Sequence, residues 1–162
     1  MSSLRQLALV LLFISLIACS PRQTTNLVGL KAPNTRIQVL DGPYLPLEDY
    51  RGKTVVLVFW AQWCAKSNQL LQELNSFAAG RSNNNVFLLV SVDKAEDLEK
   101  LRFRLGPLSG SNFTYGFSGN AEYDEAYQGF RCQEVPQVFV INPSGIVIGE
   151  GEGMDVIRKL IK

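Results

Sequence analysis

The chain has 162 residues, enough for one domain with a hydrophobic core of its own. Its 16 Lys and Arg residues against 15 Asp and Glu residues give a formal net charge of +1, so the charge balance does not indicate a nucleic-acid partner. There is no histidine, which excludes a Ser-His or Cys-His catalytic pair and any His-ligated metal centre.

The first predicted element is a signal peptide. Residues 7–17 are apolar except for Ser15, and Arg5 precedes them. This run is shorter than the roughly 17–25 residues of a membrane-spanning helix, and it fits the apolar region of a secretory signal. It ends in Leu16-Ile17-Ala18-Cys19, which resembles the bacterial lipobox, where a signal peptidase cuts just before a cysteine that then carries lipid.

The lipobox resemblance implies a lipid anchor. Residues 1–18 would be removed, Cys19 would carry the lipid, and residues 19–28 would form a polar tether. Ser20 follows the cysteine, and by the same resemblance this favours the outer membrane in a diderm cell, with the protein on the periplasmic side of the cell envelope. The alternative is an ordinary secretory signal in which Cys19 is incidental.

The next predicted elements lead to the first buried strand. Residues 35–40 predict a short strand that ends at the turn Asp41-Gly42-Pro43, and residues 46–53 predict a surface connection. Residues 54–60 are continuously apolar and β-branched, as expected of a strand covered on both faces.

The rest of the chain alternates between helical and strand patterns. Apolar residues at helical spacing follow Cys64 as far as Gly80, and the last strands form a hairpin around Asn142-Pro143-Ser144-Gly145. This alternation predicts an α/β sandwich around a mixed sheet. The further predicted elements are strands at 86–92, 138–141 and 146–149, and helices at 95–105, 120–130 and 154–161.

Cys64 lies at the junction between the strand at 54–60 and the helix that follows. Backbone N–H groups and the helix dipole favour an anion at such a position, so a thiolate there is stabilised. A redox dithiol would place its second cysteine three residues later, where this chain has Ser67. The segment therefore looks like a thiol–disulfide active site that lacks one sulfur.

Three blocks resemble the thioredoxin superfamily, and more narrowly its extracytoplasmic TlpA-like branch, which borders the peroxiredoxins of the AhpC/TSA neighbourhood. Gly29-Leu30-Lys31-Ala32-Pro33, together with residues 47–53, looks like the lead-in of that branch. Residues 55–64 match its active-site strand, and residues 135–145 match its cis-proline strand and hairpin. The resemblance implies a thioredoxin-like domain over residues 29–162.

The resemblance also implies roles for single residues. Cys64 falls on the attacking cysteine, and Trp60 and Trp63 fall on the aromatic residues around it. Pro136 falls on the proline whose preceding bond is cis, which turns the backbone of Val135 toward the sulfur, where it can pair with a substrate strand. Trp63 and Val135 are the implied substrate-binding residues.

Three departures from the family pattern concern the acid–base groups and the proline. A buried carboxylate of thioredoxin is replaced by Val58, and a helix glutamate of the TlpA-like branch is replaced by Leu70. Gln137 follows the proline where a threonine is usual. No acid–base group beside Cys64 can therefore be named from the sequence.

The sequence leaves two alternative roles open for Ser67 and two for Cys132. Ser67 either hydrogen-bonds the Cys64 sulfur or is a serine of the first helical turn, but it cannot resolve a mixed disulfide. Cys132 either packs in the core or resolves a Cys64 mixed disulfide, which needs Cα atoms within about 7 Å. None of the three cysteines has the spacing of a zinc site.

The sequence thus predicts a membrane-anchored protein of the bacterial envelope that exchanges thiols and disulfides through Cys64. Its partners would be protein or small-molecule thiols and disulfides, with no cofactor and no metal. The alternative is a redox-inactive thioredoxin-fold binding module. A peroxiredoxin-like peroxidase is disfavoured, since the residues before Cys64 contain neither the proline nor the threonine of that family's motif.

Overall fold

A computed structural model describes residues 26–79, 84–108 and 112–161. The predicted signal peptide and Cys19 lie outside the described residues. Leu27, near the end of the predicted tether, is buried in the core, and its N–H donates to Glu150 Oε2 at 2.9 Å. Among the described residues, no helix is both long enough and apolar enough to cross a bilayer.

The centre of the fold is a five-stranded mixed sheet with the order β5-β4-β3-β6-β7. Strands β3, β4 and β5 are parallel, β6 runs antiparallel to β3, and β7 runs antiparallel to β6. The predicted thioredoxin-like sandwich with a mixed sheet is confirmed. The five strands, in chain order, are Thr54–Trp60, Asn85–Ser91, Phe113–Phe117, Gln137–Ile141 and Val147–Gly151.

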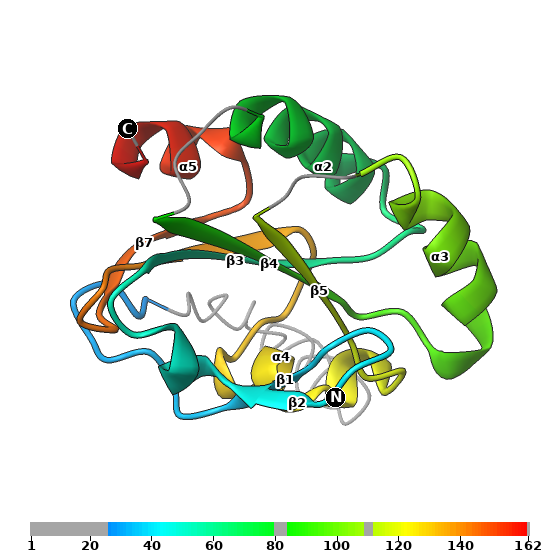
Figure 1. Ribbon diagram of the computed structural model, residues 1–162, viewed down its shortest axis with the longest axis horizontal. Helices are drawn as coiled ribbons and strands as arrows, with labels where there is room; N and C mark the ends of the chain where they lie inside the picture. Colours follow the sequence, from blue (N-terminus) through cyan, green and yellow to red (C-terminus); the bar gives the residue numbers. More distant parts are fainter. Residues whose placement is uncertain (1–25, 80–83, 109–111, 162) are drawn as a thin grey trace, which may run out of the picture.

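The sheet is covered on both faces (Figure 1). Helices α2 (Ala65–Ala78), α3 (Leu98–Leu105) and α5 (Met154–Leu160) pack on one face. The hairpin of β1 (Arg36–Gln38) and β2 (Tyr44–Pro46) and the short helix α4 (Glu125–Gly129) cover the other, together with the short helical turns η1 (Leu47–Tyr50) and η3 (Ala121–Tyr123).

This double coverage explains the continuous apolar character of β3. Successive side chains of a strand point to opposite faces. Leu57 and Phe59 accordingly pack toward α4, while Val56, Val58 and Trp60 pack toward α2. From Val55 to Trp60 the strand is buried on both faces, and its polar residue, Thr54, lies at the partly exposed start.

The sequence patterns did not predict edge strand β5 or hairpin strand β2. Strand β5 alternates Phe113, Tyr115 and Phe117 on one face, but it is short and has Gly116, a residue that is uncommon in strands, on the other face. A Cβ at Gly116 would lie 2.8 Å from Ile37 Cγ2, so the glycine serves the close approach of β1 rather than a turn. Residues 44–46 pair with β1, although the sequence assigned no element to residues 44 and 45 and placed Pro46 at the start of a surface connection.

Two predicted helices are broken into shorter pieces. The helix at 95–105 begins as a short 3-10 turn, η2 (Ala95–Asp97), before α3. The helix at 120–130 is divided at Asp124, whose carboxylate accepts from the N–H groups of Ala126 and Tyr127 and so caps α4. A side chain that satisfies these two donors starts a new helix instead of continuing the old one.

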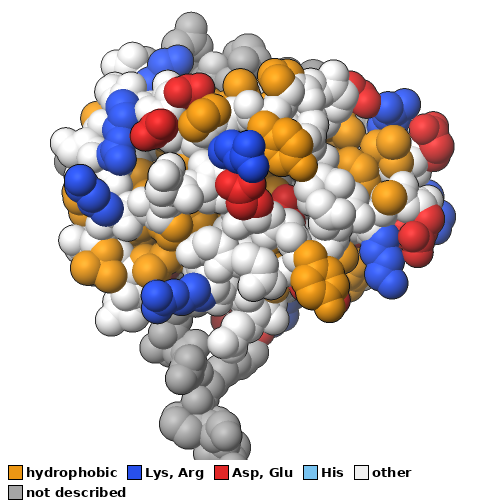
Figure 2. All heavy atoms as spheres, turned by 90° about the horizontal axis from the view of Figure 1, so that it is seen from below, with side chains coloured by type: hydrophobic (Ala, Val, Ile, Leu, Met, Phe, Trp, Pro, Cys, Tyr) orange, Lys and Arg blue, Asp and Glu red, His pale blue; other side chains and the backbone are white. Residues whose placement is uncertain are grey.

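Charged side chains are spread over the surface. Figure 2 shows blue and red side chains interspersed over the face that carries β1, β2 and α4, with no basic patch gathered on it. That distribution agrees with the near-neutral net charge of the chain and offers no footprint for a nucleic acid on that face.

Candidate active site around Cys64

Cys64 lies where β3 ends and α2 begins. It is the N-cap residue of α2, with extended backbone angles (φ −91°, ψ 115°), and its carbonyl accepts from Asn68 N at 3.1 Å. Its side chain is partly exposed and packs against the core cluster under α4. The sulfur therefore lies at the positive end of a helix of 14 residues and remains open to a second sulfur.

The Cys64 sulfur faces the loop before β6. Its thiol donates to the backbone carbonyl of Val135, with Sγ 3.4 Å from the oxygen. The Val135–Pro136 peptide bond is cis, as the family resemblance implied. Three of the predicted site residues, Cys64, Val135 and Pro136, are thus brought together from segments 71 residues apart in sequence.

Ser67 is fully buried under Cys64 on the first turn of α2. Its hydroxyl oxygen accepts from the Ala61 N–H at 3.4 Å. In the described part of the chain, Ser67 makes no hydrogen bond to the Cys64 sulfur. This geometry favours the second alternative, a serine of the first helical turn, and it adds a contact that the sequence did not predict, to the backbone just after β3.

A buried carboxylate accepts a hydrogen bond from the backbone of Gln62, in the loop that carries Cys64. Asp93, at the end of β4 and fully buried, accepts through Oδ2 from Gln62 N at 3.0 Å and from Ser91 Oγ at 2.6 Å. Its other oxygen, Oδ1, has no hydrogen-bond partner. Asp93 is the site residue that sequence reasoning missed, because the carboxylate comes from β4 and not from β3 or α2.

Asn68 completes the attachment of the loop. Its side-chain amide donates to the carbonyls of Gln62, at 2.8 Å, and of Cys64, at 3.0 Å. Together with Ser67 and Asp93, it fixes both backbone donors and backbone acceptors of residues 61–64. The loop that presents Cys64 is therefore held by side chains from two elements rather than by the sheet itself.

The two tryptophans of the motif have different surroundings. Trp60 is fully buried and packs toward α2. Trp63 is 70% exposed and stands directly before Cys64, so its ring offers an apolar surface to a partner.

Cys132 is a core residue. It is only 8% exposed, and its N–H donates to the Tyr127 carbonyl at 3.1 Å. Burial raises the pKa of the Cys132 thiol well above its ordinary value, and the carboxylates of Asp124 and Glu150 add to this rise. Cys64 and Cys132 are both unpaired. The resolving role of Cys132 stays a prediction that this arrangement does not favour.

No metal-binding group accompanies the site. In the described ranges, no three Cys, Asp or Glu side chains gather closely enough to hold a metal ion.

These features define a thioredoxin-fold protein with a cysteine at the strand–helix junction beside a cis-proline loop. Residues 28–149 match the AhpC/TSA family, and the chain belongs to that family. The predicted placement in the thioredoxin superfamily, on its border with the AhpC/TSA proteins, is confirmed.

Two curated relatives and one solved structure illustrate the similarity. The thiol-disulfide oxidoreductase ResA of Bacillus thuringiensis is 35% identical over 134 residues, which cover 82% of this chain and 74% of ResA. The probable nucleoredoxin 3 of rice is 28% identical over 144 residues, 85% of this chain but only 29% of that longer protein.

The solved structure is the thioredoxin domain of a thiol-disulfide oxidoreductase from Bacteroides vulgatus. It superposes with a TM-score of 0.66 at 19% identity, over 83% of this chain and 98% of the domain, which establishes the fold.

Proposed function

We propose that this protein exchanges thiols and disulfides through the single active-site cysteine Cys64. The observation that carries the proposal is the placement of the Cys64 sulfur. It lies at the N-terminus of α2 and 3.4 Å from the Val135 carbonyl, with the cis bond to Pro136 immediately after. The similarity to proteins named thiol-disulfide oxidoreductases supports the same chemistry.

The exchange proceeds in two steps that balance without an added oxidant. The Cys64 thiolate attacks one sulfur of a substrate disulfide, a Cys64–substrate disulfide forms, and the other substrate sulfur leaves as a thiolate. Position 67 carries a hydroxyl, which cannot attack this mixed disulfide. A second, external thiol attacks it instead and releases Cys64 as a thiolate.

The proposal includes a place in the cell envelope. It is supported by the apolar segment at residues 7–17 and the lipobox-like sequence that ends at Cys19. A lipid-modified Cys19 would tether the domain to a membrane, the outer membrane in a diderm cell, and would take no part in redox chemistry. Metabolic labelling with a fatty acid, lost in the Cys19→Ser variant, tests the anchor separately from the exchange.

The test of the exchange uses a peptide whose cysteine is disulfide-linked to 5-thio-2-nitrobenzoate. Attack by Cys64 on the peptide sulfur releases the coloured thiolate, which is followed by absorbance. We expect Cys64→Ser to reduce the rate by at least about 100-fold, because no other exposed thiolate remains in the domain. The matched variant Cys132→Ser, which removes the buried thiol, is expected to keep the wild-type rate.

The second cysteine of a redox dithiol is replaced by the buried Ser67. This replacement favours one other function, that of a redox-inactive binding module. Equal rates for the wild-type protein and Cys64→Ser would exclude exchange at this site and establish that alternative. Hydrogen peroxide serves as a second substrate. We expect no consumption of it, since the residues before Cys64 lack the peroxidase motif.

A further inference from the structure

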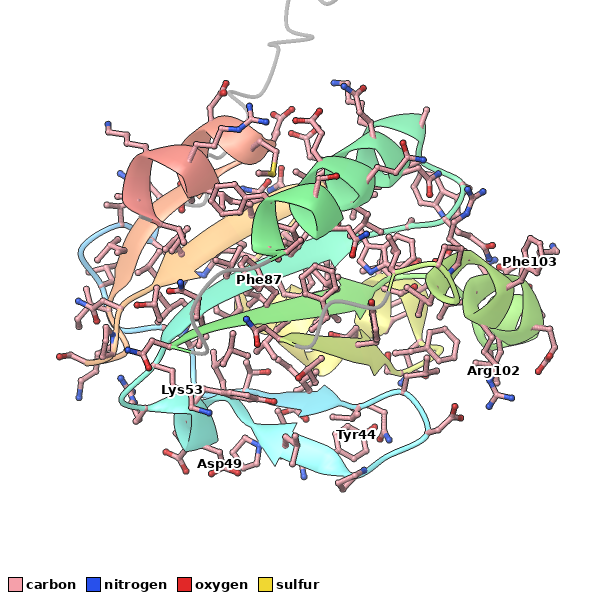
Figure 3. All side chains as sticks on the ribbon, turned by 45° about the horizontal axis from the view of Figure 1, so that its top comes forward. Tyr44, Asp49, Lys53, Phe87, Arg102 and Phe103 are labelled. Atoms are coloured by element: carbon pink, nitrogen blue, oxygen red, sulfur yellow. The ribbon has the colours of Figure 1, made fainter. Side chains whose placement is uncertain are left out.

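An exposed aromatic side chain on α3 has no role in the fold. Phe103 is 87% exposed, whereas Leu101 and Leu105 of the same helix are buried in the core. Residues two positions apart lie on opposite sides of a helix, so Phe103 points away from the sheet. Figure 3 shows its ring projecting outward from α3.

Phe103 lines an open groove that reaches the active-site loop. The groove has a volume of about 480 Å³ and is lined by Gln62, Glu99, Lys100, Phe103 and Arg104. Gln62 links the active-site loop to α3, because its side chain donates to the Asp97 carbonyl at 3.5 Å, just before α3 begins. The groove thus starts two residues before Cys64, on the same loop as the exposed Trp63.

Among the described residues, ion pairs engage two of the three charged side chains that line the groove. Lys100 is paired with Asp97 at 3.1 Å, and Glu99 is paired with Arg102 at 3.4 Å. Arg102 also pairs with Asp41, at 2.5 Å. Arg104 has no acidic partner in the part of the chain that the structure describes. The Arg104 guanidinium can pair with an acidic side chain of a partner, and the neighbouring Phe103 ring can contact an apolar one.

We propose that this groove binds the polypeptide that flanks the disulfide of a protein substrate, and so selects protein disulfides over small ones. The inference rests on the exchange proposed for Cys64. The bound segment carries an apolar side chain that contacts Phe103 and an acidic side chain that pairs with Arg104. Aromatic residues and arginine are the side chains that most often dominate such contacts.

Two mixed disulfides of 5-thio-2-nitrobenzoate with cysteine peptides test the inference. One peptide has leucine and aspartate two to four residues from the cysteine on both sides, and the other has only glycine and serine there. In both, Cys64 forms a disulfide with the peptide and the nitrobenzoate thiolate leaves. We expect the wild-type protein to react about 10-fold faster with the leucine–aspartate peptide, and Phe103→Ser and Arg104→Ala each to remove most of this preference.

Tyr123 supplies the matched control, because it is 76% exposed in η3 and does not line the groove. Tyr123→Ser is expected to keep the wild-type preference. A wild-type protein without preference, or a preference that Phe103→Ser leaves unchanged, would overturn the inference. An equal loss in Phe103→Ser and Tyr123→Ser would overturn it too.

A second measurement separates this inference from the exchange itself. The leucine–aspartate peptide is made with serine in place of its cysteine and with a fluorophore, and its binding is followed by anisotropy. Weaker binding to Phe103→Ser than to Tyr123→Ser supports the groove even if neither disulfide reacts. Equal affinities, or an absence of binding to the wild-type domain, would contradict the groove even if Cys64 exchanges disulfides rapidly.

Discussion

Cys64 and Cys132 meet the same core cluster from different positions. Cys132 is a member of the cluster, buried beside Tyr127, whereas Cys64 packs against its margin with its sulfur partly exposed. Burial and two nearby carboxylates raise the pKa of the Cys132 thiol and so keep it protonated. The Cys64 thiol lies at the N-terminus of α2, opposite the Val135 carbonyl.

The difference teaches that two cysteines in contact with one core cluster can have unlike surroundings, one in the apolar interior and one at a helix terminus. A thiolate at Cys132 would have to form in an apolar environment near Asp124 and Glu150, which disfavours it. Cys64, by contrast, is the N-cap residue of α2, and its side chain is partly exposed. Three predictions test this contrast.

The largest effect is expected when Cys64 gains a neighbouring sulfur. Ser67→Cys places a thiol on the first turn of α2, so a Cys64 mixed disulfide can be resolved within the molecule. Because an intramolecular attack replaces a bimolecular one, we expect release of the bound peptide to accelerate on the order of 100-fold or more. Quenched-flow analysis of peptide release measures it.

Ser67→Ala is the matched control for that gain. It removes the hydroxyl that accepts from the Ala61 N–H but supplies no sulfur. If Ser67→Ala accelerated release as much as Ser67→Cys, the gain would come from loosening the loop and the proposed chemistry at position 67 would be wrong.

A smaller effect is expected at the carboxylate under the loop. Asp93→Ala leaves the Gln62 N–H and the Ser91 hydroxyl without their buried acceptor. A buried donor without a partner costs about 1–3 kcal/mol. We therefore expect the free energy of unfolding, measured by urea denaturation, to fall by about that amount, and the exchange rate of Cys64 to fall with it.

Asp93→Asn keeps an oxygen in place for the Gln62 N–H. It is expected to lose less stability than Asp93→Ala and to retain most of the exchange rate. A domain that tolerates Asp93→Ala with unchanged stability and rate would show that the loop is positioned without this carboxylate.

The smallest effect is a pH dependence that belongs to Cys132. Its raised pKa keeps the folded thiol protonated, while the unfolded chain loses that proton above about pH 8.5. The unfolded state then binds fewer protons, so the Cys132 contribution to stability is fully present below this pH and falls above it, by about 1 kcal/mol per pH unit.

Cys132→Ala lacks this contribution. The difference in unfolding free energy between the wild-type protein and Cys132→Ala is therefore expected to be constant from pH 6 to 8 and to shrink from pH 9 to 10. Denaturation curves at these pH values measure it. A difference that stays constant up to pH 10 would mean that Cys132 titrates normally and is not a core thiol.

The strongest sequence patterns predicted the fold and the strand–helix junction that carries Cys64. The apolar run of β3, the Trp-Cys at its end and the Val135-Pro136 pair are local signals, and each has its expected place in the structure. Strand β5 was missed since its glycine is explained only by contact with β1. The helix break at Asp124 was missed because a capping side chain and a helical one look alike in sequence.

The sequence by itself determined most of the larger elements, their order and the position of Cys64, because hydrophobic period and chain connectivity can be followed along the chain. Only the tertiary structure decided which side chains surround that cysteine. Asp93 reaches the loop from the segment after β4, Val135 from the loop before β6, and α3 contributes the groove beside it. These neighbours meet because β3 and the parallel β4 end at the edge of the sheet where the antiparallel β6 begins, which is a property of the packed fold.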